Sequence, residues 1–163
     1  MKKVLPLLLL AFILSGCGLV GIGDNSDNGA NNGTASEFVL EGIDGETWQL
    51  SDLEGSVVVL YFWSASCPPC VYRLPDLEVL SGEMPPDSYL LLVNLNDSRE
   101  RIQGLTEGYE NMNLLVNGFS LFHEYGLRFT PSTVIFDRQG NMVDKFAGFP
   151  PNQEVLDTVN KIE

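Results

Sequence analysis

The chain has little positive charge and few side chains that bind metals. Nine lysines and arginines stand against 22 aspartates and glutamates, which gives the 163 residues a formal net charge of −13 at pH 7. An acidic surface repels phosphate backbones, so the composition argues against a nucleic-acid partner. The three cysteines and the single histidine, which are Cys17, Cys67, Cys70 and His123, lack the spacing of a zinc site. We therefore expect neither nucleic-acid binding nor a bound metal.

The N-terminal region also has no apolar run long enough to span a membrane comfortably. Lys2 and Lys3 precede a short apolar stretch, residues 4–14. A basic start followed by a short apolar stretch is typical of a signal peptide, and a membrane-spanning helix needs about 20 apolar residues. We therefore expect residues 1–16 to be a targeting segment that is not part of the fold.

The end of this segment, Leu14-Ser15-Gly16-Cys17, resembles the lipobox of bacterial lipoproteins. In that family the signal peptide is cleaved before the cysteine, which then carries lipid. The resemblance implies that Cys17 is lipidated and that the protein is attached to a membrane in the bacterial cell envelope. An ordinary secretory signal with an incidental cysteine is the alternative. Disulfides persist in the envelope, and lipidation of Cys17 would leave Cys67 and Cys70 as a pair.

Beyond Cys17 the sequence predicts a linker and one domain. Residues 17–36 are rich in Gly, Asn and Asp and offer little to bury, so we expect a flexible tether. Residues 37–163 are long enough for one hydrophobic core and show no internal repeat. Their patterns predict strands at 38–40, 47–50, 57–63, 89–95, 113–116, 132–136 and 142–147, and helices at 69–80, 99–109, 121–125 and from Pro151 or Asn152 onward.

The order of these elements indicates the fold class. An N-terminal hairpin around Asp44-Gly45 precedes alternating strands and helices, and a second hairpin follows them. Alternating strands and helices favour parallel pairing, whereas hairpins pair antiparallel. We therefore expect an α/β fold with a mixed sheet flanked by helices.

A C-x-x-C pair lies where a predicted strand meets a predicted helix. Six of the seven residues in 57–63 are β-branched or aromatic, which is typical of a buried strand, and Pro69 suits the first turn of the following helix. Free backbone N–H groups and the helix dipole at this junction stabilise a thiolate, which is the nucleophile in disulfide exchange. Cys67 and Cys70 are therefore predicted to form a redox centre, and a purely structural disulfide is the alternative.

Three separated segments resemble a known family. Residues 60–70 resemble the active-site segment of thioredoxin-fold proteins, and residues 45–55 resemble the lead-in of the TlpA/ResA-like branch. Thr130-Pro131 followed by residues 132–140 resembles the cis-proline loop and closing hairpin of that branch. Its members are membrane-tethered thiol–disulfide oxidoreductases of the bacterial envelope. The resemblance implies a three-layer thioredoxin-like fold and an enzyme that exchanges disulfides with protein partners and needs no cofactor.

The motif positions carry expected roles. Cys67 is nearer the start of the helix and should be the more exposed sulfur, so we expect it to be the nucleophile and Cys70 to be the resolving cysteine. Pro131 matches the cis-proline of the family, and the resemblance implies that the Thr130 backbone pairs with an extended substrate chain.

Four neighbouring residues are candidate modulators of the redox centre. Pro68 and Pro69 lie between the cysteines, and Pro68 removes a backbone N–H and restricts the loop. Tyr61 stands where thioredoxins carry a buried aspartate, and Arg73 stands where many TlpA/ResA-like proteins carry a glutamate. The carboxylates thought to handle the proton of the resolving thiol are therefore absent at both positions. One hypothesis is that Arg73 points toward the site and favours the thiolate, and the alternative is that it is a solvated helix residue.

The leading functional prediction is a thiol–disulfide oxidoreductase that reduces protein disulfides and receives electrons from a membrane thiol donor. In the resembled branch a frequent task is to keep apocytochrome c thiols reduced for haem attachment, and the rescue of other envelope thiols is compatible with the sequence. Three alternatives are a copper-delivery lipoprotein of the Sco type using His123, a lipoprotein with a structural disulfide, and a peroxiredoxin. Sco proteins use C-x-x-x-C, and peroxiredoxins normally lack a C-x-x-C pair.

Overall fold

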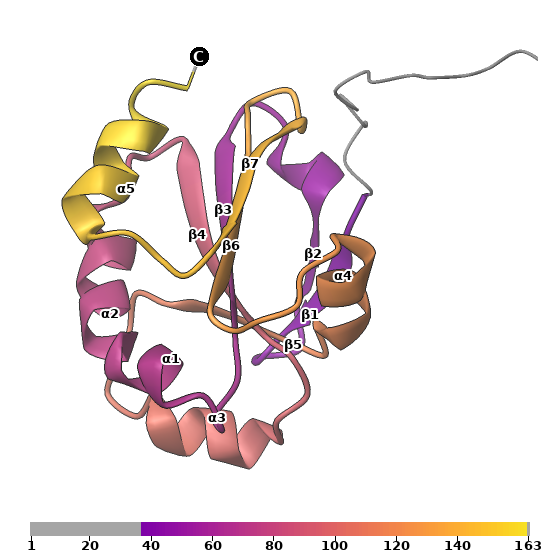
Figure 1. Ribbon diagram of the computed structural model, residues 1–163, viewed down its shortest axis with the longest axis vertical. Helices are drawn as coiled ribbons and strands as arrows, with labels where there is room; N and C mark the ends of the chain where they lie inside the picture. The colour runs from indigo at the N-terminus through magenta and orange to yellow at the C-terminus, as the bar shows by residue number, and fades with distance from the viewer. Residues whose placement is uncertain (1–36, 163) are drawn as a thin grey trace, which may run out of the picture. The chain divides into compact units, whose positions relative to one another are not determined.

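The computed structural model describes residues 37–162 (Figure 1). The expected signal peptide, the candidate lipidation site Cys17 and the expected tether lie outside the described residues. The elements in chain order are β1 (Val39–Gly42), β2 (Thr47–Gln49), the 3₁₀ turn η1 (Leu50–Leu53), β3 (Val57–Trp63), α1 (Pro68–Tyr72), α2 (Leu74–Glu83), β4 (Ser88–Asn94), α3 (Arg99–Leu105), β5 (Asn113–Val116), α4 (Phe119–Glu124), β6 (Ser132–Phe136), β7 (Met142–Ala147) and α5 (Asn152–Val159).

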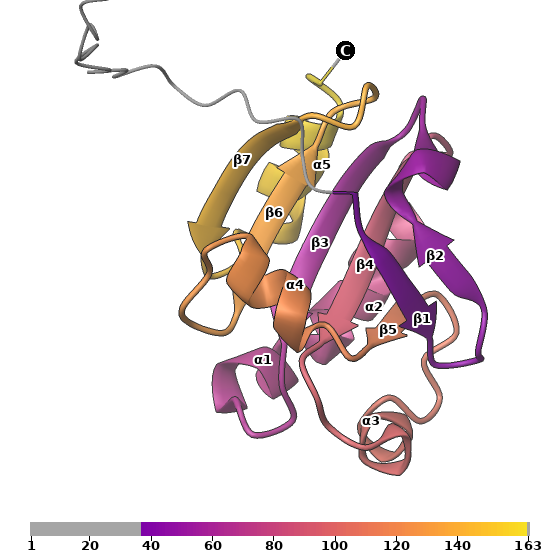
Figure 2. The ribbon, with the colours of Figure 1, turned by 90° about the vertical axis from the view of Figure 1, so that its right-hand side faces the viewer.

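The strands form one seven-stranded mixed sheet in the order β2-β1-β5-β4-β3-β6-β7. β3 pairs parallel with β4 and antiparallel with β6, and β1 pairs antiparallel with β2 as the N-terminal hairpin. Figure 2 shows β3 and β4 side by side in the middle of the sheet, with α1 and α3 beyond the carboxyl ends of these two strands. The prediction of a mixed sheet that begins and ends with hairpins is confirmed.

The sheet separates two hydrophobic cores. All seven residues of β3 are buried, and they alternate between the cores because successive side chains of a strand point to opposite faces. Leu60 and Phe62 pack with Phe122 of α4, whereas Tyr61 and Trp63 pack with side chains from α1, α2, α3 and α5. Figure 1 shows α2 and α5 on one side of the sheet and α4 on the other, so the sheet lies between two helical layers.

The helix predicted over residues 69–80 is two helices. α1 ends and α2 begins at Arg73, which is the C-terminal cap of the first helix and the N-terminal cap of the second. Pro75 follows two residues later and has no N–H to donate to the carbonyl of Val71, so one regular helix cannot continue through this point. The helix predicted over 99–109 also ends early, at Leu105, and Gly108 then adopts a positive φ of 85°.

None of the helices among residues 37–162 combines the length and the apolar character needed to cross a bilayer.

Candidate active site

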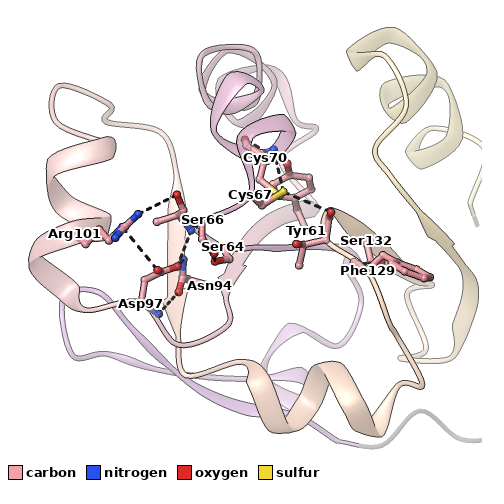
Figure 3. Close-up of a disulfide and its surroundings, with 12 residues drawn as sticks. Tyr61, Ser64, Ser66, Cys67, Cys70, Asn94, Asp97, Arg101, Phe129 and Ser132 are labelled. Carbon is pink, nitrogen blue, oxygen red and sulfur yellow. Dashed lines mark hydrogen bonds and ion pairs between the residues drawn. A yellow bond between two sulfur atoms is a disulfide. The ribbon is translucent and has the colours of Figure 1, made fainter.

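Cys67 and Cys70 form a disulfide at the start of α1 (Figure 3). Cys67 has extended backbone geometry and is the N-terminal cap of the helix, and its Sγ accepts a hydrogen bond from the backbone N–H of Cys70 at 3.3 Å. Cys70 lies one turn into the helix and is fully buried, whereas Cys67 is partly exposed. A partner that approaches from solvent therefore reaches the sulfur of Cys67 first.

The two prolines between the cysteines occupy the first two positions of α1. Both are exposed, and neither has an N–H. The Cys70 N–H is therefore the only donor that the first three helical residues can direct at Cys67 Sγ. Because free N–H groups at a helix start stabilise a thiolate, the prolines limit that stabilisation to one hydrogen bond and the helix dipole.

The loop before β6 lies against the disulfide. The Thr130–Pro131 peptide bond is cis, which agrees with the match of Pro131 to the cis-proline of the family. The carbonyl oxygen of Thr130 lies 3.5 Å from Cys67 Sγ. Ser132 Oγ donates a 2.6 Å hydrogen bond to the carbonyl of Phe129, and the N–H of Gly148 donates one of 2.7 Å to the carbonyl of Pro131. These bonds fix the loop, so that the Thr130 backbone stays beside the reactive sulfur.

Tyr61 lies behind the disulfide on β3. Its hydroxyl donates to the carbonyl oxygen of Cys70 at 3.5 Å, and its ring meets the ring of Phe149 edge-on with centroids 5.1 Å apart. Burial raises the pKa of the Tyr61 hydroxyl far above its usual value, and the charge of Arg73 opposes this shift only in part. Tyr61 therefore stays protonated at neutral pH and serves as a hydrogen-bond donor. It cannot accept a proton in place of a carboxylate.

Arg73 binds the loop that precedes α5 and the first residue of α5. Its Nη2 donates to the carbonyl of Pro150 and to Asn152 Oδ1, both at 3.2 Å, and its guanidinium lies 5.6 Å from the ring centroid of Phe149. An ion pair of 2.9 Å joins it to Asp76. These contacts join the α1–α2 junction to the loop before α5 and to the start of α5. Whether Arg73 also favours the Cys67 thiolate stays a prediction.

Three polar residues that sequence reasoning did not assign to the site support the loop before Cys67. They are Asn94 at the end of β4, Asp97 just after it and Arg101 in α3 (Figure 3). Burial opposes ionisation of Asp97, but hydrogen bonds from Ala65, Asn94 and Ser64 and the charge of Arg101 outweigh it and lower the pKa of its carboxyl. A signal was available in the sequence, because β3 and β4 were both predicted and the carboxyl ends of parallel strands meet at one sheet edge.

Two large apolar side chains near the site are exposed. Tyr72, the last residue of α1, is 84% exposed, and Phe129, next to Thr130, is 71% exposed. Tyr72 ends the helix that contains Cys70, and Phe129 belongs to the loop whose Thr130 carbonyl lies beside Cys67 Sγ. Exposed aromatic side chains of this kind suit contact with another protein.

His123 lies elsewhere, on the surface of α4. Its ring meets the ring of Phe119 edge-on with centroids 4.5 Å apart. Among residues 37–162, no three His, Cys, Asp or Glu side chains are grouped so that they could hold a metal ion.

Comparison with known proteins gives consistent matches. The model of the AhpC/TSA family matches residues 32–145, a segment that includes both cysteines and Pro131. The thiol–disulfide oxidoreductase ResA of Halalkalibacterium halodurans is 32% identical over 132 residues, which cover 79% of this chain and 75% of that protein. The thioredoxin-like protein YneN of Bacillus subtilis is 26% identical over 125 residues, or 74% of each chain.

Among solved structures, the exposed lipoprotein thioredoxin Etrx1 of Streptococcus pneumoniae matches with a TM-score of 0.69 and 31% sequence identity. The match covers 77% of this chain and 99% of Etrx1. A sequence and a structural comparison thus point to the same kind of protein.

Proposed function

Since the chain belongs to the AhpC/TSA family of thioredoxin-like proteins and is a thiol–disulfide oxidoreductase similar to ResA, we propose that it acts in a bacterial cell envelope as a reductant of protein disulfides. The observation that carries the exchange reaction is the asymmetry of the disulfide, and the direction of electron transfer rests on the resemblance to the TlpA/ResA-like branch. Cys67 is partly exposed at a helix start, and Cys70 is buried behind it.

The reaction proceeds by two exchanges. In the reduced protein the Cys67 thiolate attacks one sulfur of the partner's disulfide, so that a mixed disulfide forms and the partner's other sulfur leaves as a thiolate. Cys70 loses its proton to solvent and attacks Cys67 Sγ, which breaks the mixed disulfide and releases the partner's second sulfur as a thiolate. The two electrons of the dithiol have then passed to the partner, whose thiolates take up protons from water. A membrane thiol donor restores the Cys67–Cys70 dithiol.

Because the two side chains at the family's carboxylate positions are not proton acceptors, we propose that the Cys70 proton leaves to solvent. Tyr61 donates to the Cys70 carbonyl and stays protonated, and the guanidinium of Arg73 is bound to the loop before α5. Neither residue accepts a proton, although they occupy the two positions at which the resembled families carry a carboxylate. Exchange at Cys70 is therefore expected to depend on pH through the thiol itself.

The surroundings of Cys67 suit an extended protein segment as substrate. The Thr130 backbone lies beside the sulfur, and the exposed rings of Tyr72 and Phe129 offer apolar contacts to residues that flank a substrate cysteine. By resemblance to the TlpA/ResA-like branch, we propose that the partners are envelope proteins whose cysteines must be kept reduced. Apocytochrome c awaiting haem attachment is one such partner.

We further propose that Cys17 carries lipid and that residues 17–36 tether the domain, residues 37–163, to the membrane. The sequence Leu14-Ser15-Gly16-Cys17 supports this proposal. Etrx1, which is similar over 77% of this chain, is itself described as a lipoprotein. Labelling cells with a radioactive fatty acid tests it, because Cys17→Ser should abolish incorporation into this protein.

Trapping of mixed disulfides tests the assignment of the two sulfurs. Cys70→Ser leaves the attacking sulfur in place and removes the resolving one, so the full-length variant should accumulate a covalent complex with a disulfide-containing protein. Cys67→Ser should form none, because Cys70 is buried. Complexes formed equally by both variants, or by neither, would contradict the proposed function.

A further inference from the structure

The loop between β3 and Cys67 is bound by side chains from a distant segment (Figure 3). The backbone N–H of Ala65 donates to Asp97 Oδ2 at 2.6 Å, and Arg101 Nη2 donates to the carbonyl oxygen of Ala65 at 3.3 Å. Both backbone groups of a residue just before the reactive cysteine are thus hydrogen-bonded to charged side chains that begin 32 positions later in the chain.

The Asp97 carboxylate is itself fixed in place. Asn94 is completely buried at the end of β4, its Nδ2 donates to Asp97 Oδ2 at 3.0 Å, and its Oδ1 accepts from the Asp97 N–H at 2.8 Å. Arg101 Nε lies 3.9 Å from Asp97 Oδ1, and the side chain of Asp97 is only 13% exposed. Asn94 is the register partner of Trp63 in the pairing of β4 with β3. The central strands of the sheet therefore hold the Asp97 carboxylate in place through Asn94.

The position of Ala65 affects Cys67 through a short turn. The N–H of Cys67 donates to the carbonyl of Ser64 at 3.1 Å, and the N–H of Ser66 donates to Ser64 Oγ at 3.2 Å. Ala65 lies within this turn, and the turn ends at the cysteine. Movement of Ala65 would therefore move Cys67 at the start of α1.

The position of Cys67 depends most on the bonds to Ala65 when the disulfide is reduced. The covalent bond between Cys67 and Cys70 is then absent, while the bonds to Ala65 remain available. The thiolate is stabilised by the Cys70 N–H, which lies 3.3 Å away in the disulfide form, and by the helix dipole, whose effect is confined to the first turn. A sulfur that drifts from this position loses both.

We propose that Asp97 and Arg101 are positioning residues for the redox centre, which fix Ala65 at both backbone groups and thereby keep the Cys67 thiolate at the start of α1. This inference rests on the proposed role of Cys67 as the attacking sulfur. It predicts that loss of Asp97 raises the pKa of Cys67, whereas a purely electrostatic role predicts a fall and a purely structural role predicts no change. The charge of Asp97 disfavours a nearby thiolate, so loss of a purely electrostatic role would lower the pKa of Cys67. Loss of a purely structural role would change stability alone.

The test is the pKa of Cys67 in the reduced full-length protein, taken from the pH dependence of its alkylation by iodoacetamide. Peptide mass spectrometry identifies the sulfur that reacts. Asp97→Ala should raise the pKa of Cys67 and slow its alkylation at pH 7 by about threefold or more. Asp97→Asn keeps an oxygen that accepts from the Ala65 N–H and removes the charge, so the pKa should stay at the wild-type value or fall below it.

Glu78→Ala is the matched control. The Glu78 carboxylate also accepts backbone N–H groups, from Glu110 and Asn111 at 3.0 and 3.1 Å, but in a different loop. Its removal should leave the pKa of Cys67 unchanged.

Arg101→Met is a second variant, which keeps the hydrogen bonds of Asp97 to Ala65 and Asn94 and changes a side chain that is 58% exposed. If Arg101 acts by position, the variant should raise the pKa of Cys67 by the same amount at 0.1 M and 1 M NaCl. If it acts by charge alone, the rise should vanish at 1 M NaCl, where the Debye length is about 3 Å. That result would overturn its positioning role.

The outcomes separate the two proposals. Alkylation of Cys70 in place of Cys67 in the wild-type protein would contradict the proposed function. Alkylation of Cys67 with a pKa that Asp97→Ala leaves unchanged or lowers would overturn only the positioning role of Asp97.

Discussion

The backbone N–H of Cys70 donates to Cys67 Sγ at 3.3 Å, across a first helical turn in which Pro68 and Pro69 have no N–H to offer. The side chain of an N-terminal cap normally accepts from the second or third helical residue. In this chain the second position is Pro69, so one of the two usual donors is missing. The residue at the second helical position therefore determines how many N–H groups can stabilise the Cys67 thiolate.

Replacing Pro69 should strengthen the stabilisation of the thiolate. Pro69→Ala supplies an N–H at the second helical position, so the pKa of Cys67 should fall by on the order of half a unit, and the reduction potential should become less negative because the dithiol form gains stability. Pro68→Ala is the matched control, because an N–H at the first position does not reach the cap side chain. An equal or larger effect of Pro68→Ala would contradict this account.

Arg73 is expected to stabilise the fold more than it tunes the sulfur. Arg73→Ala removes the hydrogen bonds to Pro150 and Asn152 and the contact with the Phe149 ring, so the free energy of unfolding should fall by about 1–2 kcal/mol. Asp76→Ala removes only the partly exposed ion pair and should cost less. Denaturant unfolding measures both changes. A shift in the pKa of Cys67 in Arg73→Ala, without a loss of stability, would instead support direct thiolate stabilisation.

Burial of Tyr61 should lower the free energy of unfolding in alkaline solution. Burial raises the pKa of its hydroxyl in the folded protein, whereas the unfolded chain has the ordinary value near 10. The unfolded state therefore loses its proton first, and the stability contributed by neutral Tyr61 is present below about pH 10 and declines as pH rises above it. Tyr61→Phe should reduce this decline in unfolding experiments between pH 8 and about 11. A decline of the same size in Tyr61→Phe would show that other groups cause it.

Phe129 is expected to act on protein substrates alone. Phe129→Ser removes an exposed apolar contact next to Thr130, so the reduction of a protein disulfide should slow by up to on the order of tenfold. Reduction of a small aromatic disulfide that contacts only the sulfur should be unaffected. Val39→Ser, which changes a 61% exposed side chain on β1, should alter neither rate. Equal slowing of both substrates by Phe129→Ser would place the defect at the sulfur itself.

The parts of the structure that follow from local sequence were predictable. The β-branched and aromatic run of β3, the prolines at the start of α1 and the turn at Asp44-Gly45 each determine a neighbouring conformation, and the hydrophobic pattern places β3 in the middle of the sheet. The cis geometry before Pro131 was expected only from resemblance to a family, because local sequence does not select it.

The contacts that complete the site depend on segments distant in the chain. Arg73 donates hydrogen bonds to Pro150 and Asn152, which lie 77 and 79 positions later in the chain. Asp97 accepts one from Ala65, which lies 32 positions earlier. Hydrophobic periodicity predicts the strands that bring Asp97 near the site, but it does not specify which polar groups form hydrogen bonds there. Sequence reasoning treated residues 69–80 as one helix, whereas the structure divides this segment into two helices at Arg73.

The reduction potential of the Cys67–Cys70 disulfide in the full-length protein tests the central claim most directly. Equilibration with a dithiol couple should give a value near about −250 mV or lower, in the range of thioredoxin, because a reductant must have a potential below that of its targets. A value near about −120 mV, as in strong oxidants of the thioredoxin fold, would contradict the proposed direction of electron transfer. A disulfide that does not equilibrate while the protein stays folded would contradict a redox role altogether.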